Sequence, residues 1–534
     1  MSVGNVNVGN WVTKWASLNP DKPAIIFEDK TFTYKDLNER INQTAHMLQG
    51  MSIGKGDRVG VLMYNTYQLV EIFFALAKIG AILVPLNTRF VSSELEYIIK
   101  DSGLEALILG DNFIGVLEPL SRSLPIKDGH YLCLGKPPVW AKNYEAEMMA
   151  QRSVSEPVVN ELAGGEDAII IMYTSGTTGD PKGAVLSHRK TFFNALNANI
   201  YYGLRPSDVM LAPRPMFHSG GLLVELCPII YKGATLIMKG RFSPEEILTT
   251  IKKHKVTILE IAATVLRFIL EQCDIDKYDL SSLRVCYTGG ERVSPALMED
   301  YEKKGIIVSQ IYGQTETSTL TWLSMEDAVR KRGSVGKPVF HGDVKIVGKD
   351  GQPVGPGKIG EVVVSGYITM NGYWGRPELT EDTIVDGWLH TGDLARADEE
   401  GFFYIIDREK DMYISGGENV YPAEIERAYL ENRKILDVGV CGIPDHKWGE
   451  AGLACIVLKN GETMTEEEAL QFCDGRLARY KIPKVVRFVN ELPINAAQKV
   501  IRKKLREDYL EAVAAATSEV APQPGLQVKR REAR

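Results

Sequence analysis

Short apolar runs alternate with amphipathic segments through the first hundred residues of the chain. The runs at 58–63 and 104–109 are rich in Val, Ile and Leu and have the length of buried strands. Ahead of them, Leu37, Ile41 and Ala45 recur at the spacing that places apolar side chains on one helical face. Repeated strand–helix units of this kind predict mostly parallel sheets with helices on both faces.

Capping signals mark the ends of the predicted helices. Asn65 stands where it can cap a helix that follows a predicted strand. Ser93 and Glu96 have the spacing of a capping box, and Gly103 suits the end of the helix that they begin. The most apolar window, 69–86, contains charged residues, so we predict a buried helix and strand there and no membrane span.

The pattern changes at an Asp-Arg-Glu-Lys-Asp string, which predicts a domain boundary. We expect a large N-terminal domain at 1–408, a small mobile domain at 409–516 and a disordered tail at 517–534. Pro422 suits the first turn of a helix in the small domain, and 499–515 has the pattern of its last helix. The predicted fold class is α/β, with mixed, mostly parallel sheets and helices on both faces in the large domain and an α+β small domain.

The composition of the chain argues against several functional classes. The chain has 534 residues, and its 62 Lys and Arg against 69 Asp and Glu give a net charge of −7, which argues against a nucleic-acid binder. Its seven cysteines form no Cys-x-x-Cys pair, so we expect reduced thiols, no zinc site and a cytoplasmic location. The basic end of the tail leaves peripheral membrane association open, although a solvated end is the simpler interpretation.

Residues 173–183 form the most informative stretch, Tyr-Thr-Ser-Gly-Thr-Thr-Gly-Asp-Pro-Lys-Gly. Glycines let backbone N–H groups converge on an anion, hydroxyls add donors, and the lysine adds a mobile positive charge. The loop lacks the Gly-Lys-Ser/Thr of a Walker motif, and an apolar strand pattern flanks it on both sides. A flexible polar hairpin is the alternative interpretation. The candidate phosphate-binding residues are Thr174, Ser175, Gly176, Thr177, Thr178, Gly179 and Lys182.

This loop resembles the phosphate loop of the AMP-forming adenylating enzymes, which include acyl- and aryl-CoA synthetases, peptide-synthetase adenylation domains and luciferases. Further motifs extend the resemblance over nearly the whole chain. It implies a reaction in which a carboxylate first attacks the α-phosphate of ATP, and the resulting acyl-adenylate is then cleaved by a thiol. The cofactors that it implies are ATP, Mg²⁺ and CoA as co-substrate.

A second motif, Tyr-Gly-Gln-Thr-Glu-Thr, follows an apolar stretch. The resemblance implies that Thr315 contacts the α-phosphate and Glu316 holds Mg²⁺, with Tyr312, Gly313 and Gln314 beside the nucleotide. The chemistry agrees, because Mg²⁺ is usually bound by one or two carboxylates together with phosphate oxygens. Taken alone, the motif is equally consistent with a capped helix N-terminus.

Two further segments complete the nucleotide pocket that the resemblance implies. Gly289, Gly290 and Glu291 would form a wall of the adenine and acyl pocket, since glycines let a planar group lie against the backbone. Asp393, which we expect at the end of a strand, would bind the ribose hydroxyls with the assistance of Arg408.

The segment 215–221, Pro-Met-Phe-His-Ser-Gly-Gly, is informative about the acid. The resemblance implies that its Phe and His218 gate the carboxylate channel. Amino-acid-activating relatives place an acidic residue nearby, whereas no acid appears here before Glu225, so we predict an apolar acid. The small Ala262 and Ala263 favour a deep channel and hence a medium- or long-chain fatty acid over an aromatic acid.

The small domain supplies the remaining candidates. Ser415, Gly416 and Gly417 would line the pantetheine tunnel of CoA, with Trp448 nearby. A helix N-terminal turn explains the same glycines, and both interpretations hold together.

Lys499 matches the lysine that stabilises the adenylation transition state in the family, although Ala-Gln precedes it here in place of the usual Thr-Gly. Lys410 matches the hinge. Rotation about Lys410 would bring Lys499 and the CoA loop to the same nucleotide in turn.

We therefore expect an ATP-dependent carboxylic acid–CoA ligase for a small-molecule acid, acting as a homodimer. The favoured substrate is a fatty acid, and the alternative is an aromatic acid of the benzoate or cinnamate type. The chain ends soon after Lys499 without a carrier domain, which disfavours a peptide-synthetase module. Light output would reveal a luciferase, ADP in place of AMP would reveal a phosphoryl-transferring NTPase, and failure to release pyrophosphate would reveal a non-catalytic AMP-binding regulator.

Overall fold

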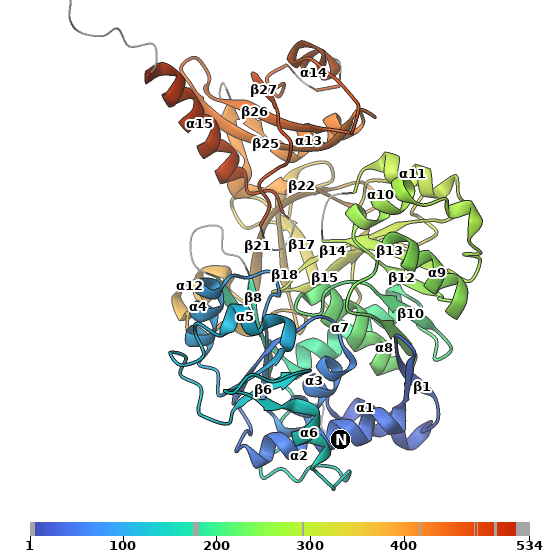
Figure 1. The fold of residues 1–534 in the computed structure, drawn as a ribbon. Coiled ribbons are helices and arrows are strands. Elements are labelled where there is room, and N and C mark those ends of the chain that lie inside the picture. Colours follow the sequence, from blue (N-terminus) through green and yellow to red (C-terminus); the bar gives the residue numbers. More distant parts are fainter. Residues whose placement is uncertain are drawn as a thin grey trace, which may run out of the picture. The chain divides into compact units, whose positions relative to one another are not determined.

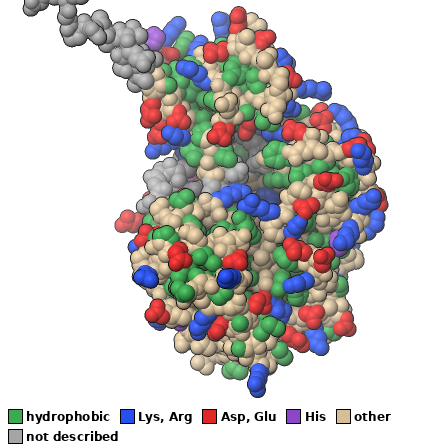
Figure 2. Space-filling model, viewed as in Figure 1, with side chains coloured by type: hydrophobic (Ala, Val, Ile, Leu, Met, Phe, Trp, Pro, Cys, Tyr) green, Lys and Arg blue, Asp and Glu red, His purple; other side chains and the backbone are tan. Residues whose placement is uncertain are grey.

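A computed structural model describes residues 6–174, 181–290, 293–415, 418–474, 476–477, 479–495 and 499–518. Internal contacts divide the chain into an N-terminal unit, Met1–Ile405, and a C-terminal unit, Ile406–Arg534. The element labels are those of Figure 1, in which colours follow the sequence. On the face drawn in Figure 2, acidic and basic side chains lie intermixed.

The N-terminal unit contains a nine-stranded sheet whose interior strands are parallel. Its order is β16 (Lys337–Pro338), β15 (Ser318–Trp322), β14 (Ser309–Gln314), β13 (Val285–Gly289), β12 (Ile258–Glu260), β10 (Val209–Ala212), β11 (Thr235–Met238), β1 (Pro23–Phe27) and β2 (Lys30–Thr33). Antiparallel pairs occur only toward its two edges, in β1–β2, β14–β15 and β15–β16.

The second sheet has eight strands and a parallel centre. Its order is β19 (Gly372–Tyr373), β9 (Lys182–Ser187), β8 (Ala168–Thr174), β4 (Ile82–Pro85), β3 (Arg58–Leu62), β5 (Ala106–Gly110), β6 (Tyr131–Leu134) and β7 (Lys142–Asn143). Strands β8 and β9 pair antiparallel and enclose the glycine-rich loop.

A third, antiparallel sheet contains β17 (Asp343–Val347), β18 (Ile359–Ser365), β21 (Trp388–Ala397) and β20 (Ile384–Val385), with β22 (Phe403–Arg408) paired to β21. The α-helices of the N-terminal unit are α1 (Asn10–Leu18), α2 (Tyr34–Gly50), α3 (Tyr67–Ile79), α4 (Ser92–Ser102), α5 (Ile114–Leu117), α6 (Tyr144–Met149), α7 (His188–Tyr201), α8 (Cys227–Lys232), α9 (Pro244–His254), α10 (Ala263–Gln272), α11 (Pro295–Glu302) and α12 (Pro377–Thr383). A π-helical turn, η2 (Gly220–Leu226), precedes α8.

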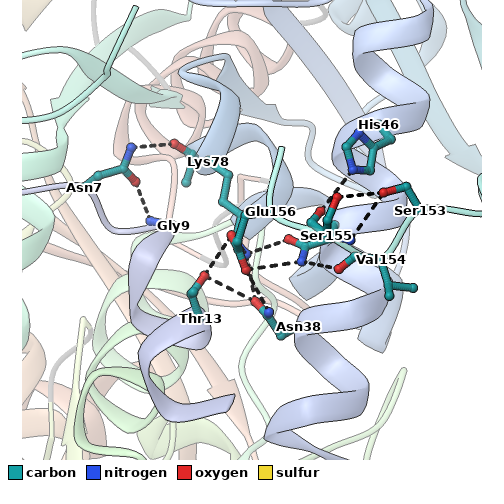
Figure 3. A network of polar contacts seen from close by, with 12 residues as sticks. Asn7, Gly9, Thr13, Asn38, His46, Lys78, Ser153, Val154, Ser155 and Glu156 are labelled. Atoms are coloured by element: carbon teal, nitrogen blue, oxygen red, sulfur yellow. Dashed lines mark hydrogen bonds and ion pairs between the residues drawn. The ribbon is translucent and has the colours of Figure 1, made fainter. Parts of the chain in front are cut away.

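Helix α3 is buried along its whole length, and one core cluster includes it together with residues of both large sheets. A polar network fastens this helix to its neighbours (Figure 3). The Lys78 ammonium donates to Asn38 Oδ1, Asn42 Oδ1 and Glu156 Oε2, each at 2.7 Å. Burial lowers the pKa of Lys78 to about 8, and the charge of Glu156 opposes part of that shift.

The C-terminal unit is a smaller α+β structure. Its sheet contains β24 (Glu418–Val420), β23 (Tyr413–Ser415), β26 (Gly449–Leu458) and β25 (Ile435–Asp445), with β27 (Val485–Phe488) paired to β26. Its α-helices are α13 (Pro422–Leu430), α14 (Glu466–Phe472) and α15 (Arg502–Ser518). These observations and the mixed α/β architecture of the N-terminal unit confirm the predicted fold class.

Several local expectations were wrong. Thr66, not Asn65, caps α3, because the Asn65 side chain instead pairs with the backbone of Arg214 and Met216. At α4 it is Glu94, not Glu96, that accepts from the backbone ahead of the helix, although Gly103 ends it as expected with φ 62°.

In the C-terminal unit the predicted start of the last helix was wrong, whereas the predicted helix at Pro422 is present. Its last helix begins at Arg502, so Lys499 precedes it. The helix predicted at Pro422 is present. In the described part of the chain no helix has the length and apolarity needed to cross a membrane.

Candidate active site

The β8–β9 hairpin holds the two described ends of the glycine-rich loop together. Thr174 and Lys182 are register partners, and the Thr174 hydroxyl donates to the Lys182 carbonyl at 3.4 Å. Loop residues 175–180, which include Ser175, Gly176, Thr177, Thr178 and Gly179, lie outside the described residues.

Glu316 faces the same hairpin from the turn between β14 and β15. Its Oε1 accepts from the Tyr373 hydroxyl at 3.0 Å and from the Thr174 hydroxyl at 3.4 Å. The Lys182 ammonium donates to the Tyr373 hydroxyl at 2.7 Å and lies 4.0 Å from the centre of its ring. Burial and, next, the charge of Glu316 raise the pKa of Tyr373, so the hydroxyl stays protonated and can donate.

The donor set around Glu316 fits a hard cation that arrives with phosphate. No cluster of three or more His, Cys, Asp or Glu suited to a metal occurs among the described residues. Glu316 itself is 9% exposed and has hydroxyl neighbours. A single carboxylate beside a candidate phosphate loop is the pattern expected of a Mg²⁺ site completed by substrate oxygens.

Asp393 lies in the interior of β21, not at a strand end as expected. Its Oδ2 accepts from the Tyr312 hydroxyl and from Gln314 Nε2, both at 2.7 Å. Gln314 Nε2 also donates to the Thr391 carbonyl at 2.9 Å. The structure thus connects three candidate nucleotide residues from two motifs that are 81 positions apart along the chain.

Two glycines let the strands of this site approach closely. A Cβ on Gly313 would lie 1.8 Å from the Ser318 carbonyl oxygen across the β14–β15 hairpin. A Cβ on Gly289 would lie 2.4 Å from the Ile311 carbonyl oxygen of β14. Gly290 has φ 80°, and Glu291 lies outside the described residues.

His218 and Thr315 are placed by the backbone around them. The His218 N–H donates to the Pro215 carbonyl at 3.2 Å, and its ring lies 4.4 Å from that of Phe217. His218 lies two residues before η2, and Thr315 is half-buried in the turn that carries Glu316.

Sequence reasoning missed two residues of this neighbourhood. Tyr373 bridges Lys182 and Glu316 but belongs to a two-residue strand without a motif. Lys190 is 1% exposed in α7, where it donates a short hydrogen bond to the Ser318 hydroxyl. Lys190 could have been noticed as a charged residue on the buried face of a helix. No local sequence signal identified Tyr373.

The C-terminal unit brings two of its CoA candidates together. Ser415 of β23 pairs with Gly449 of β26, the residue directly after Trp448, and Trp448 is 39% exposed. Gly416 and Gly417 lie outside the described residues. Trp448 belongs to a tight turn in which its N–H donates to Asp445 Oδ1 at 2.9 Å.

Lys499 is joined to Asn495 of the same unit by two hydrogen bonds. Its N–H donates to Asn495 Oδ1 at 3.0 Å, its carbonyl accepts from the Asn495 N–H at 2.8 Å, and its side chain is exposed. Arg408 ends β22, and Lys410 lies in a short 3₁₀ turn, Glu409–Asp411. Both belong to the C-terminal unit, whereas Asp393 belongs to the N-terminal unit.

Comparisons with known proteins agree with this arrangement. A family model described as "AMP-binding enzyme" matches residues 12–374, and one described as "AMP-binding enzyme C-terminal domain" matches residues 424–499. A 2-succinylbenzoate–CoA ligase of Bacillus cytotoxicus is 38% identical over 499 residues, which are 93% of this chain and 98% of the relative.

Two solved structures show the same architecture. The O-succinylbenzoate coenzyme A synthetase of Bacillus subtilis, in complex with ATP and magnesium ion, is 33% identical with a TM-score of 0.82, over 93% of this chain and 99% of that chain. The Mycobacterium tuberculosis fatty acyl CoA synthetase is 36% identical with a TM-score of 0.75, over 95% and 99% of the two chains. The chain belongs to the AMP-binding enzyme family, as an AMP-forming acid–CoA ligase of the adenylate-forming acyl- and aryl-CoA ligase superfamily.

Proposed function

We propose that this ligase activates an aromatic carboxylic acid with ATP and Mg²⁺ and transfers the acyl group to CoA. The observation that carries the ATP step is the position of Glu316, which lies against both described ends of the phosphate loop through Thr174 and Tyr373. The names of the relatives support the acid, because those of Bacillus act on 2-succinylbenzoate. They favour the aromatic alternative over the fatty acid that the sequence suggested.

In the first step a carboxylate oxygen of the acid attacks the α-phosphorus of ATP, the bond to the β-phosphate oxygen breaks, and pyrophosphate leaves. The residues at 174–179 and Lys182 hold the phosphates, and Thr315 contacts the α-phosphate. Mg²⁺ at Glu316 would neutralise phosphate charge. His218 and Phe217 border the channel through which the carboxylate enters.

The adenosine half of the substrate is held by a second group of residues. Asp393, oriented by Tyr312 and Gln314, accepts hydrogen bonds from the ribose hydroxyls. Gly289, Gly290 and Glu291 form the wall against which adenine and the acyl group lie. Arg408 assists at the ribose.

In the second step the CoA thiol loses its proton and its sulfur attacks the acyl carbon, the bond to the AMP phosphate oxygen breaks, AMP leaves, and the thioester forms. Ser415, Gly416, Gly417 and Trp448 line the path of the pantetheine arm. Lys499 serves the first step, and rotation of the C-terminal unit about Lys410 exchanges Lys499 for the CoA loop.

The experiment is an AMP- and pyrophosphate-release assay with CoA and Mg²⁺ over a panel of acids. The panel contains 2-succinylbenzoate, benzoate, a cinnamate and straight-chain fatty acids from six to sixteen carbons. We expect the highest kcat/KM with an aromatic acid and AMP as the nucleotide product. A fatty acid as the best substrate would overturn the aromatic assignment. The panel includes fatty acids because one similar structure is a fatty acyl CoA synthetase.

Two expectations about the whole enzyme belong to the same proposal. We expect a homodimer in the cytoplasm, with any membrane association peripheral. Light scattering on the purified chain measures the mass, and a monomer would refute the dimer.

A further inference from the structure

Strand β21 departs from regular pairing at the Thr-Gly-Asp string that carries the candidate ribose ligand. Glu361 of β18 is the register partner of Leu394. Two residues further along β18, Val363 is the partner of His390. Three residues of β21, at 391–393, therefore lie opposite a single residue of β18, and we call them the Thr-Gly-Asp bulge. Bulges beside a functional site commonly re-aim a side chain that a regular strand would point elsewhere.

Side-chain hydrogen bonds hold the Thr-Gly-Asp bulge against β18. The Gly392 N–H donates to Glu361 Oε1 at 2.8 Å. The Thr391 hydroxyl donates to the Val362 carbonyl at 2.6 Å and accepts from the Asp393 N–H at 3.1 Å. Gly392 has φ 68°, a left-handed conformation that glycine adopts without strain. The backbone path into Asp393 is therefore set by these contacts.

The Glu361 carboxylate is itself held in one orientation. Its Oε2 lies 2.7 Å from His390 Nδ1, and because a carboxylate accepts, the imidazole nitrogen is the donor. The exposed fraction is 18% for the Glu361 side chain and 36% for that of His390. An ion pair at this level of exposure contributes little to stability. The backbone N–H that Glu361 holds explains the arrangement better than the ion pair does.

The same bulge is held from its other side by Gln314 of β14. Its Nε2 donates to the Thr391 carbonyl at 2.9 Å and to Asp393 Oδ2 at 2.7 Å. Contacts from two strands thus fix both the backbone and the carboxylate of Asp393. Such precision matters for binding, since a hydrogen bond weakens steeply when its distance or angle departs from the ideal.

Resting on the proposed function, in which Asp393 binds the ribose hydroxyls, we propose that Glu361 is a positioning residue for that carboxylate. By accepting from the Gly392 N–H it replaces a strand partner and sets the direction in which Asp393 leaves the bulge. His390 keeps the Glu361 carboxylate turned toward the bulge. Glu361 acts through the backbone and not by contact with the nucleotide.

The test measures ribose recognition by equilibrium binding, which needs no acid, no CoA and no turnover. Isothermal titration calorimetry gives the Kd of AMP, 2′-deoxyAMP and 3′-deoxyAMP, and the Kd of each deoxy analogue divided by that of AMP measures the worth of one hydroxyl. For the wild type we expect at least one ratio of about 10 to 100, the worth of a charge-assisted hydrogen bond. Asp393→Ala should bring that ratio close to 1.

Two substitutions of Glu361 separate the hydrogen bond from the charge. Glu361→Met keeps the length of the side chain but offers no acceptor to the Gly392 N–H, so the ratio should fall by at least about fivefold. Glu361→Gln keeps an acceptor oxygen, and a neutral His390 can accept from its amide, so the ratio should stay within about threefold of wild type.

Glu246→Met is the matched control. Glu246 Oε2 accepts from the Ser243 N–H at 2.8 Å and pairs with Lys239, but it does so at the start of α9. This variant should leave both ratios unchanged. If Glu361→Met does not fold, as judged by circular dichroism, Thr391→Val decides in its place, because it removes the hydroxyl that joins the same bulge to β18 and should produce the same fall.

The outcomes distinguish the inference from the proposed function. A folded Glu361→Met chain with wild-type ratios, or an equal fall in the methionine and glutamine variants, would overturn the positioning role and leave the ribose assignment of Asp393 intact. Ratios near 1 in the wild type, or ratios that Asp393→Ala does not change, would overturn that assignment and the inference with it. A fall in Glu361→Met that Glu361→Gln does not show would establish the inference.

Discussion

Gly313→Ala should disable the site by separating two strands while leaving the rest of the fold in place. The new Cβ would lie 1.8 Å from the Ser318 carbonyl oxygen, whereas ordinary van der Waals contact begins at 3.4 Å. The β14–β15 hairpin must therefore open by about 1.6 Å, and the partner is backbone that cannot rotate away. Glu316 lies in the turn that this hairpin closes, so it moves with the strands.

The expected effect is larger on activity than on stability. Displacements of about 1 Å in a catalytic constellation can cost on the order of 10²-fold in rate, so we expect kcat/KM to fall by at least about 100-fold. Overpacking of this kind costs about 1–3 kcal/mol of the free energy of unfolding, which leaves the variant folded.

The assay is pyrophosphate release with ATP, Mg²⁺ and the best acid, together with urea unfolding followed by circular dichroism. Gly355→Ala is the matched control, because a Cβ there meets no atom within 4 Å, and it should behave as wild type. A folded Gly313→Ala enzyme with kcat/KM within threefold of wild type would refute the reasoning.

Three other changes test separate parts of the structure. Glu316→Gln keeps the size of the side chain but removes its charge, so we expect pyrophosphate release to fall by about 100-fold or more and to respond little to added MgCl₂; an unchanged Mg²⁺ titration would contradict the assignment. Lys499→Ala should abolish ATP–pyrophosphate exchange yet spare thiolysis of supplied acyl-adenylate, and equal loss of both half-reactions would exclude its role in the first step. Lys78→Met tests the network of Figure 3: the pKa of Lys78 in the folded chain is about 8 against 10.5 ordinarily, so between these values the unfolded chain binds more protons. The stability of the wild type relative to Lys78→Met should therefore rise from pH 8 to pH 10, by at most about 1.4 kcal/mol per pH unit, and a difference in urea unfolding free energy that does not change with pH would contradict it.

Much of the fold could be predicted because its signals are local. Apolar runs and helical periodicity identified β3, β5 and α2, since buried strands and amphipathic helices leave their mark within a dozen residues. The start of α3 shows the limit of local signals, because Thr66 caps this helix in place of the predicted Asn65. Asn65 was available for capping in sequence, but it is used by the Arg214 backbone 149 positions away.

The candidate site also contains residues that the sequence identifies and residues that only the structure identifies. Motifs with unusual composition, such as the one that carries Glu316, were visible because glycine and hydroxyl residues cluster there. Tyr373 was not visible, because its role comes from a β9–β19 pairing that brings it to Lys182. Glu225 was noticed only as the first acid after His218, and its burial with Glu260 depends on the sheet that places β12 beside β10.

The order of the elements along the chain has a practical consequence for engineering. His218 and the hairpin that carries Glu316 both lie before Ile405, whereas Ser415, Trp448 and Lys499 all follow it. A fusion made at that point would exchange the unit that carries the proposed CoA-binding residues for one from another ligase in a single cut. From the proposed function we expect such hybrids to keep the acid preference of this chain and to acquire the thiol acceptor of the donor.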